Sequence, residues 1–249
     1  MALDSKKYEE LLAEFVAKLR AAAQDNLVSV VLYGSAAEGE FHAEYSDLNL
    51  LCIVRDTSFA ALRKIADTVG WWRKKKHRPP LVMTESELRN SADVFSIEFL
   101  DIKHRHRMLC GEDILADLSV PMNLHRHQLE YELREKLFLL RQHLLFAGTE
   151  DKAIWEVMLN SLSSFTTLFR HVLIELGEQG RKHSREATQD LATRLNFDPS
   201  AFVQLIGVRA GTTDRKRFAA ADIAAKYLSA IEIVATAVDR MQSSPAKTD

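Results

Sequence analysis

Two short stretches decide the fold, LVSVVLYGS at residues 27–35 and SDLNLLCIV at residues 46–54. Each contains an apolar run rich in β-branched residues, which is typical of a buried strand. The first run ends at Gly34 and Ser35, where the chain is expected to turn from a strand into a helix. Such a turn leaves backbone N–H groups and a hydroxyl facing outward, so the sequence predicts a phosphate cradle here.

Candidate metal ligands follow the cradle. A period of two along the second strand places Asp47 and Asn49 on one face, opposite an apolar face. We expect a further strand over residues 94–103, in which Glu98 faces away from an apolar row. Asp101 has the parity of that row, so Glu98 is the better third carboxylate. Two acids and an amide beside a phosphate cradle indicate a site for Mg²⁺, a hard ion that takes oxygen ligands.

These motifs resemble the nucleotidyltransferase superfamily of DNA polymerase β type. Within it, residues 5–113 look most like bacterial antibiotic adenylyltransferases and their uncharacterised relatives. The resemblance implies transfer of a nucleoside monophosphate from a triphosphate, ATP, to the hydroxyl of an unknown acceptor, with Mg²⁺ as cofactor. It implies that the nucleotide is bound by Gly34 and Ser35, and that the catalytic and metal-binding residues are Asp47, Asn49 and Glu98.

Asn49 departs from the family pattern, which has a second acid at this position. An amide oxygen can bind magnesium but brings no negative charge, so we expect weak catalysis or none. The alternative hypothesis is therefore a catalytically degraded nucleotidyltransferase fold that acts as a nucleotide-binding or regulatory, antitoxin-like protein.

The composition is that of a globular protein. Of the 249 residues, 47% are hydrophobic, which excludes a fibrous or disordered chain, and the net charge of -2 gives no global attraction for nucleic acid. The N-terminus lacks a signal-like apolar core, and no apolar run approaches the roughly 20 residues that span a bilayer. We expect a cytoplasmic protein without membrane contact, with Cys52 and Cys110 as reduced thiols.

Residues 1–121 and 122–249 are expected to form two domains of an α+β protein. The first is a nucleotidyltransferase-like mixed sheet with helices on one side, and the second is an all-α helical bundle, because helical periodicity dominates beyond Pro121. The long apolar-faced helix over residues 215–241 could support a homodimer. The expected strands cover residues 27–33, 47–54, 81–83 and 94–103, and the expected helices residues 6–23, 57–76, 84–91, 124–146, 152–176, 185–195, 199–208 and 215–241.

Three further motifs have plainer interpretations. The basic run at residues 73–78 is a solvated helix end, or else a phosphate or RNA contact. The preceding pair Trp71 and Trp72 is core, or else a stacking platform. The histidines within residues 104–107 and 125–127 are interleaved with arginines, which disfavours a zinc site.

Overall fold

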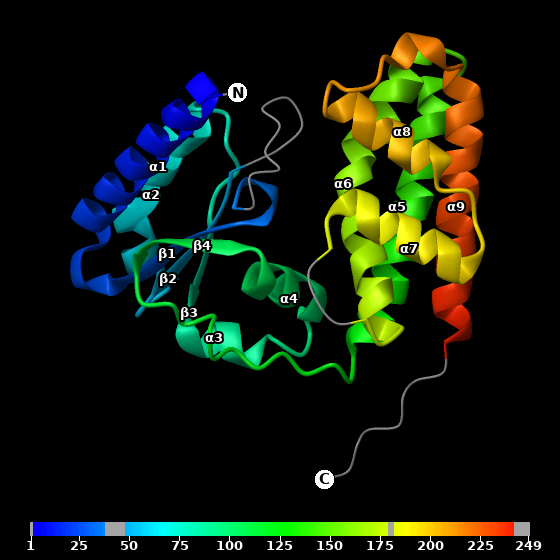
Figure 1. The fold of residues 1–249 in the computed structure, drawn as a ribbon. Coiled ribbons are helices and arrows are strands. Elements are labelled where there is room, and N and C mark those ends of the chain that lie inside the picture. Colours follow the sequence, from blue (N-terminus) through cyan, green and yellow to red (C-terminus); the bar gives the residue numbers. More distant parts are fainter. Residues whose placement is uncertain (1, 38–47, 179–181, 242–249) are drawn as a thin grey trace. The chain divides into compact units, whose positions relative to one another are not determined.

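The computed structural model describes residues 2–37, 48–178 and 182–241. The chain divides into two compact units, residues 1–120 and 121–249 (Figure 1). The N-terminal unit combines a mixed sheet with helices, and the described part of the C-terminal unit forms helices and no strand. The predicted α+β class with a helical C-terminal region is confirmed.

The sheet of the N-terminal unit has four strands in the order β3-β2-β1-β4. β1 (Leu27–Tyr33) pairs antiparallel with both β2 (Asn49–Val54) and β4 (His106–Gly111). β3 (Leu81–Thr84) pairs parallel with β2. The apolar runs of β1 and β2 therefore lie in the two central strands, where both strand edges are hydrogen-bonded.

Helices cover both faces of this sheet, so the expectation of helices on one side was wrong. Because side chains alternate along β1, Val30 and Leu32 belong to the core under α1 and α2, whereas Val31 belongs to a second core under α3 and α4. The helices are α1 (Ala2–Ala23), α2 (Phe59–Lys74), α3 (Glu85–Asn90) and α4 (Ser96–His104).

The strand predicted over residues 94–103 is instead the helix α4. Ser96, Phe99 and Ile102 are buried three residues apart, which is helical spacing. The two-residue period of a strand and the 3.6-residue period of a helix both fit so short an apolar run. The sequence pattern alone therefore does not distinguish a strand from a helix here. The fourth strand is β4, which the sequence pattern did not predict. Its first two residues belong to the histidine motif at residues 104–107.

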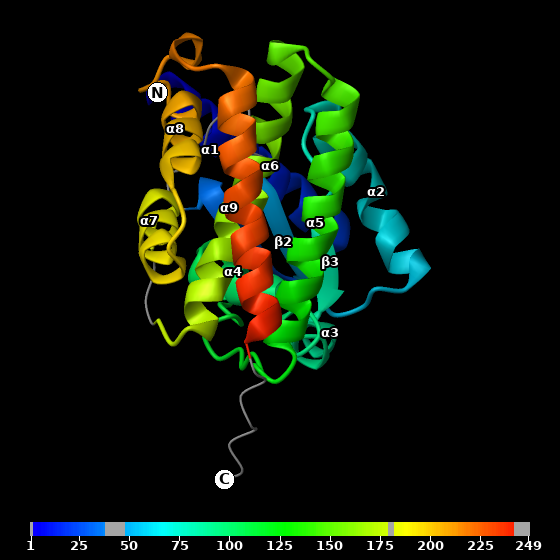
Figure 2. The same ribbon diagram turned by 90° about the vertical axis from the view of Figure 1, so that its right-hand side faces the viewer.

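Three long helices run side by side in the C-terminal unit (Figures 1 and 2). They are α5 (His125–Ala147), α6 (Asp151–Glu175) and α9 (Ala220–Arg240). The shorter α7 (Ser184–Leu195) and α8 (Ser200–Arg209) pack against α6. Aromatic rings form part of the core, where Phe202 lies 4.7 Å from Phe169 and 4.6 Å from Tyr227 between ring centroids.

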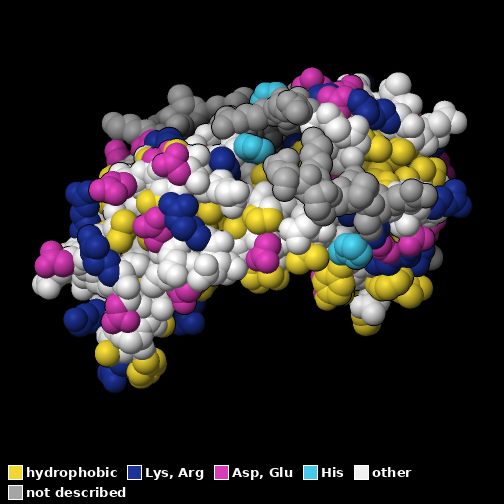
Figure 3. Space-filling model, turned by 90° about the horizontal axis from the view of Figure 1, so that it is seen from below, with side chains coloured by type: hydrophobic (Ala, Val, Ile, Leu, Met, Phe, Trp, Pro, Cys, Tyr) yellow, Lys and Arg dark blue, Asp and Glu magenta, His cyan; other side chains and the backbone are white. Residues whose placement is uncertain are grey.

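None of the helices described in the structure is long and apolar enough to cross a membrane. Charged side chains are spread over the visible face in Figure 3, with hydrophobic patches between them.

We expect Gly111→Ala to lower the free energy of unfolding by about 3 kcal/mol or more. Gly111 has a φ of +83°, and an added Cβ would lie 2.0 Å from the Val28 carbonyl oxygen, so the pairing of β1 with β4 must open. Gly211 also has a positive φ but has open space around it, so Gly211→Ala should cost only about 1–2 kcal/mol. Urea denaturation followed by circular dichroism measures both, and equal costs would contradict this account.

The two thiols should differ in reactivity. Burial raises the pKa of the Cys52 thiol to about 12, and the nearby Cys110 adds to the rise. Cys52 therefore carries almost no thiolate at pH 8, whereas Cys110 is only half-buried. Iodoacetamide should alkylate Cys110 in the native protein and both residues in urea, as mass spectrometry of tryptic peptides would reveal. Native labelling of Cys52 as fast as of Cys110 would refute the prediction.

Candidate functional site

The chain turns sharply where β1 ends. Gly34 has a φ of +78°, a backbone conformation that favours glycine, and it opens the short 3₁₀ helix η2 (Gly34–Ala36). Its N–H donates to the Arg105 carbonyl oxygen at 2.9 Å, which ties the turn to the residue before β4. That N–H is not available to a phosphate. The groups of the predicted cradle that remain are the N–H groups of Ser35 and Ala36, because the first N–H groups of a helix lack acceptors within it.

Asn49 starts β2 directly beside this turn. It pairs with Tyr33 across the two antiparallel strands. Its side-chain Nδ2 lies 3.4 Å from the position that a Cβ on Gly34 would occupy. The structure therefore brings together two of the predicted site residues, Gly34 and Asn49.

The face of β2 that carries Asn49 is not polar throughout. Leu51 and Ile53 follow Asn49 on this face, and both are fully buried. Beyond Asn49 this face of β2 is therefore core. The prediction that the Asn49 face is polar along the strand is wrong. Asp47 lies outside the described residues.

Glu98 does not lie on a strand, because α4 replaces the predicted strand. It is an exposed residue in the first turn of α4, and Phe99 beside it packs into the same core as Tyr33. The competing carboxylate, Asp101, lies 4.0 Å from the Arg105 guanidinium. The parity argument that selected Glu98 therefore fails, because it assumed a strand.

Tyr33 and Arg78 also belong to this end of the sheet, and sequence reasoning did not single them out for the site. Burial raises the pKa of the Tyr33 hydroxyl, the positive charge of Arg78 opposes the rise, and the negative charge of Glu98 adds to it. These effects place the Arg78 and Glu98 charges near the Tyr33 hydroxyl. The signal available in the sequence was that Arg78 lies just before the predicted strand at residues 81–83.

Trp72 fixes the segment that carries Arg78. Its ring is fully buried, and its Nε1–H donates to the Arg78 carbonyl oxygen at 2.9 Å. Trp71 is partly buried, with the ammonium groups of Lys18 and Lys75 at 5.2 and 5.8 Å from its ring centroid. The core interpretation is correct for Trp72.

Comparison with known proteins agrees with this architecture. Residues 12–104 match the family model described as nucleotidyltransferase domain. The matched residues lie within the N-terminal unit, which is thus similar to nucleotidyltransferase domains. Among solved structures, the fold resembles spectinomycin adenyltransferase from Enterococcus faecialis, crystallised with ATP and spectinomycin, with a TM-score of 0.57 and 13% sequence identity. The match covers 91% of this chain and 98% of that one, and at this identity it shows the fold. No curated protein matches the sequence.

Among its described residues, the N-terminal unit offers few carboxylates at this end of the sheet. β3 consists of Leu81, Val82, Met83 and Thr84, so no carboxylate faces Asn49 from the strand beside it. Among the residues that the structure describes, no group of three or more histidines, cysteines or acids could hold a metal ion. The described oxygen donors, Asn49 and Glu98, fit Mg²⁺ in chemical type but supply one negative charge between them.

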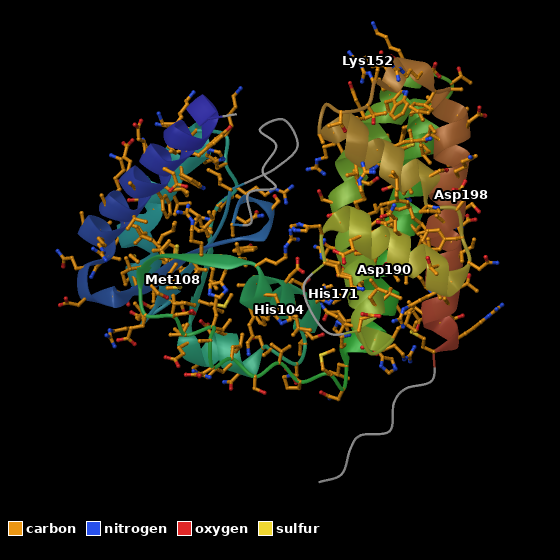
Figure 4. All side chains as sticks on the ribbon, viewed as in Figure 1. His104, Met108, Lys152, His171, Asp190 and Asp198 are labelled. Carbon is orange, nitrogen blue, oxygen red and sulfur yellow. The ribbon has the colours of Figure 1, made fainter. Side chains whose placement is uncertain are left out.

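The histidine clusters do not form metal sites within the described residues. His104 ends α4, whereas His106 lies on β4 and contacts the Lys103 carbonyl oxygen at 2.9 Å. In the C-terminal unit, buried His125 contacts the Glu175 carboxylate through Nδ1 and His171 Nδ1 through Nε2, the latter at 2.9 Å. His171 lies on α6 (Figure 4).

Substitutions at Gly34 should show whether glycine is required there by its positive φ or by the space around it. We expect Gly34→Ala to cost about 1–2 kcal/mol of stability, since its positive φ disfavours a Cβ although the Cβ would make only ordinary contact with Asn49. Gly34→Asn should cost less, because asparagine tolerates this conformation better. Thermal unfolding followed by circular dichroism measures both variants, and a larger cost for asparagine would show that space, not φ, selects glycine.

Proposed function

We propose that the N-terminal unit binds ATP with Mg²⁺ and transfers its nucleoside monophosphate to an acceptor hydroxyl. The observation that carries the proposal is the contact between the Gly34 turn and Asn49, within a domain that matches nucleotidyltransferases. The ATP bound in the structurally similar spectinomycin adenyltransferase supports the choice of nucleotide. In this proposal residues 1–121 are the catalytic domain and residues 122–249 its helical companion.

The residues of the site have distinct roles in this reaction. The Ser35 and Ala36 N–H groups, presented by the Gly34 turn, bind phosphate oxygens, and the nearby Arg78 guanidinium adds positive charge. Mg²⁺ would be held by Asp47, Asn49 and Glu98, and it would neutralise charge on the triphosphate. The acceptor oxygen forms a bond to the α-phosphorus while the bond to the bridging oxygen breaks. Pyrophosphate leaves, and the hydroxyl proton passes to Glu98 or to water.

The cytoplasm is the compartment that we propose. ATP is abundant there, and Cys52 and Cys110 are free thiols that a reducing compartment preserves.

A second candidate function is nucleotide binding without transfer, as in a regulatory or antitoxin-like protein. Two observations favour it: Asn49 is neutral, and β3 provides no carboxylate beside it. With so little negative charge, Mg²⁺ should bind poorly until the triphosphate supplies further oxygens.

Restoring the acid at position 49 tests the site directly. We expect Asn49→Asp to tighten Mg²⁺ binding and to raise pyrophosphate release from ATP roughly tenfold or more, equivalent to about 1.4 kcal/mol of transition-state stabilisation. Asp47→Ala should abolish Mg²⁺-dependent ATP binding. Pyrophosphate is measured by an enzyme-coupled assay and ATP binding by calorimetry.

Asn90→Asp is the matched control, because it makes the same change on the exposed side of α3 and should alter neither quantity. Spectinomycin and other polyhydroxylated compounds serve as trial acceptors. ATP binding without pyrophosphate release, in the wild-type chain and in Asn49→Asp, would favour the second candidate. If Asn49→Asp changes nothing and Asp47→Ala still binds ATP, the metal site itself is wrong.

A further inference from the structure

One side of α5 remains uncovered in the C-terminal unit. α5 packs against α6 and α9, whereas α7 and α8 lie against α6 (Figures 1 and 2). Five of the exposed side chains of α5 are large and apolar. We name as the α5 face the residues Tyr131, Phe138, Leu139, Leu145 and Phe146, whose exposed fractions are 64%, 54%, 44%, 81% and 91%.

The α5 face has a regular helical pattern. Tyr131, Phe138 and Leu145 recur every seven residues, so they form one line along the helix. Leu139 and Phe146 form a parallel line beside the first. Two exposed polar residues, Glu135 and Gln142, lie between the two lines, so the face is mainly apolar with one charged side chain within it.

The exposed area is sufficient for a specific interface. A fully exposed aromatic side chain offers about 200 Å². At the exposed fractions given above, the three aromatic residues offer roughly 400 Å², and the two leucines raise this to roughly 600 Å² per copy. That is the upper end of what a monomer exposes in one apolar patch. Two copies would bury about 1,200 Å², which reaches the range of stable specific interfaces.

A groove beside the α5 face could receive side chains from an opposing helix. It lies between α5 and α6 and has a volume of about 620 Å³. Among the residues that line it are Leu139, His143 and Phe146 of α5 and Glu156, Asn160 and Ser164 of α6.

We propose that the α5 face binds a second copy of this chain, with the two α5 helices antiparallel and a twofold axis passing near Phe138. Tyr131 and Leu145 lie seven residues on either side of Phe138. An antiparallel copy therefore sets Tyr131 against Leu145 of the partner subunit and the two Phe138 rings against each other. This interface is self-complementary, as a twofold dimer requires.

The sequence had suggested the helix over residues 215–241 for such a dimer. The apolar stripe of α9, which includes Ile223, Ile231 and Val234, is buried within the unit instead. The inference about α5 does not depend on the proposed nucleotidyl transfer.

Sedimentation velocity and light scattering of the full chain test the dimer. The expected mass is twice 28.2 kDa. Phe138→Glu places two carboxylates at the twofold axis, so the dissociation constant should rise roughly 30-fold or more. Ile233→Glu changes a similarly apolar residue on α9, 37% exposed, and should leave the dimer intact. Circular dichroism checks that both variants retain their helices.

Disulfide trapping tests the antiparallel geometry. Phe138→Cys should cross-link to its own copy on oxidation. Tyr131→Cys alone should not, because its two copies would lie about 21 Å apart along the helices. A mixture of Tyr131→Cys and Leu145→Cys chains should cross-link to each other. The wild-type chain, with Cys52 and Cys110, is the control for background.

A monomer at every concentration would overturn the proposal, and would mean that the face is bare or covered by another part of the chain. A dimer that survives Phe138→Glu with an unchanged dissociation constant would overturn it as well. Cross-linking of Tyr131→Cys to its own copy as efficiently as Phe138→Cys would indicate parallel helices and contradict the stated geometry.

Discussion

The position of β1 at the centre of the sheet is the constraint on which the N-terminal unit depends. Its two edges are hydrogen-bonded to β2 and β4, and its alternating side chains enter two separate cores. A strand enclosed in this way cannot shift its register without exchanging the two cores. The turn at its end is therefore held in place, with the Gly34 N–H bound to the Arg105 carbonyl oxygen and the Asn49 amide beside it. The proposed nucleotide site begins at this fixed point.

Charge limits what this site can do. Carboxylates that hold Mg²⁺ in a phosphoryl-transfer site must lie close enough to share the ion, and their mutual repulsion is offset only by the metal. Here Asn49 is neutral, β3 is apolar, and Glu98 lies on α4. Tyr33 and Arg78 complete the surroundings, with a hydroxyl whose pKa is raised by burial and a guanidinium that favours anions. Among the described residues, this end of the sheet therefore offers little negative charge to hold a metal ion.

The C-terminal unit distributes its apolar surface unevenly. α9 buries its stripe against neighbours in the bundle, and its Tyr227 hydroxyl contacts the Ser161 hydroxyl at 3.1 Å. α5 has fewer neighbours, so a comparable set of apolar residues stays in contact with water. Exposed apolar surface of this size costs free energy in water and favours association. The difference between the two helices arises from packing, since both sequences are rich in apolar residues.

Some properties of this protein follow from its sequence alone. The apolar runs at residues 27–33 and 47–54 predict buried strands because they are short and rich in apolar and β-branched residues, and the Gly34-Ser35 turn ends the first. The segment beyond Pro121 predicts helices because its helical periodicity extends over many residues. The α4 segment was ambiguous, because the alternation of Phe95, Ile97 and Phe99 competes with the helical spacing of Ser96, Phe99 and Ile102. Only the tertiary structure decided between them, since β4 occupies the free edge of β1 and the second face of the sheet needs a helix to cover it. The tertiary structure also decided which apolar residues of α5 and α9 are buried, because burial depends on the helices that pack against each of them.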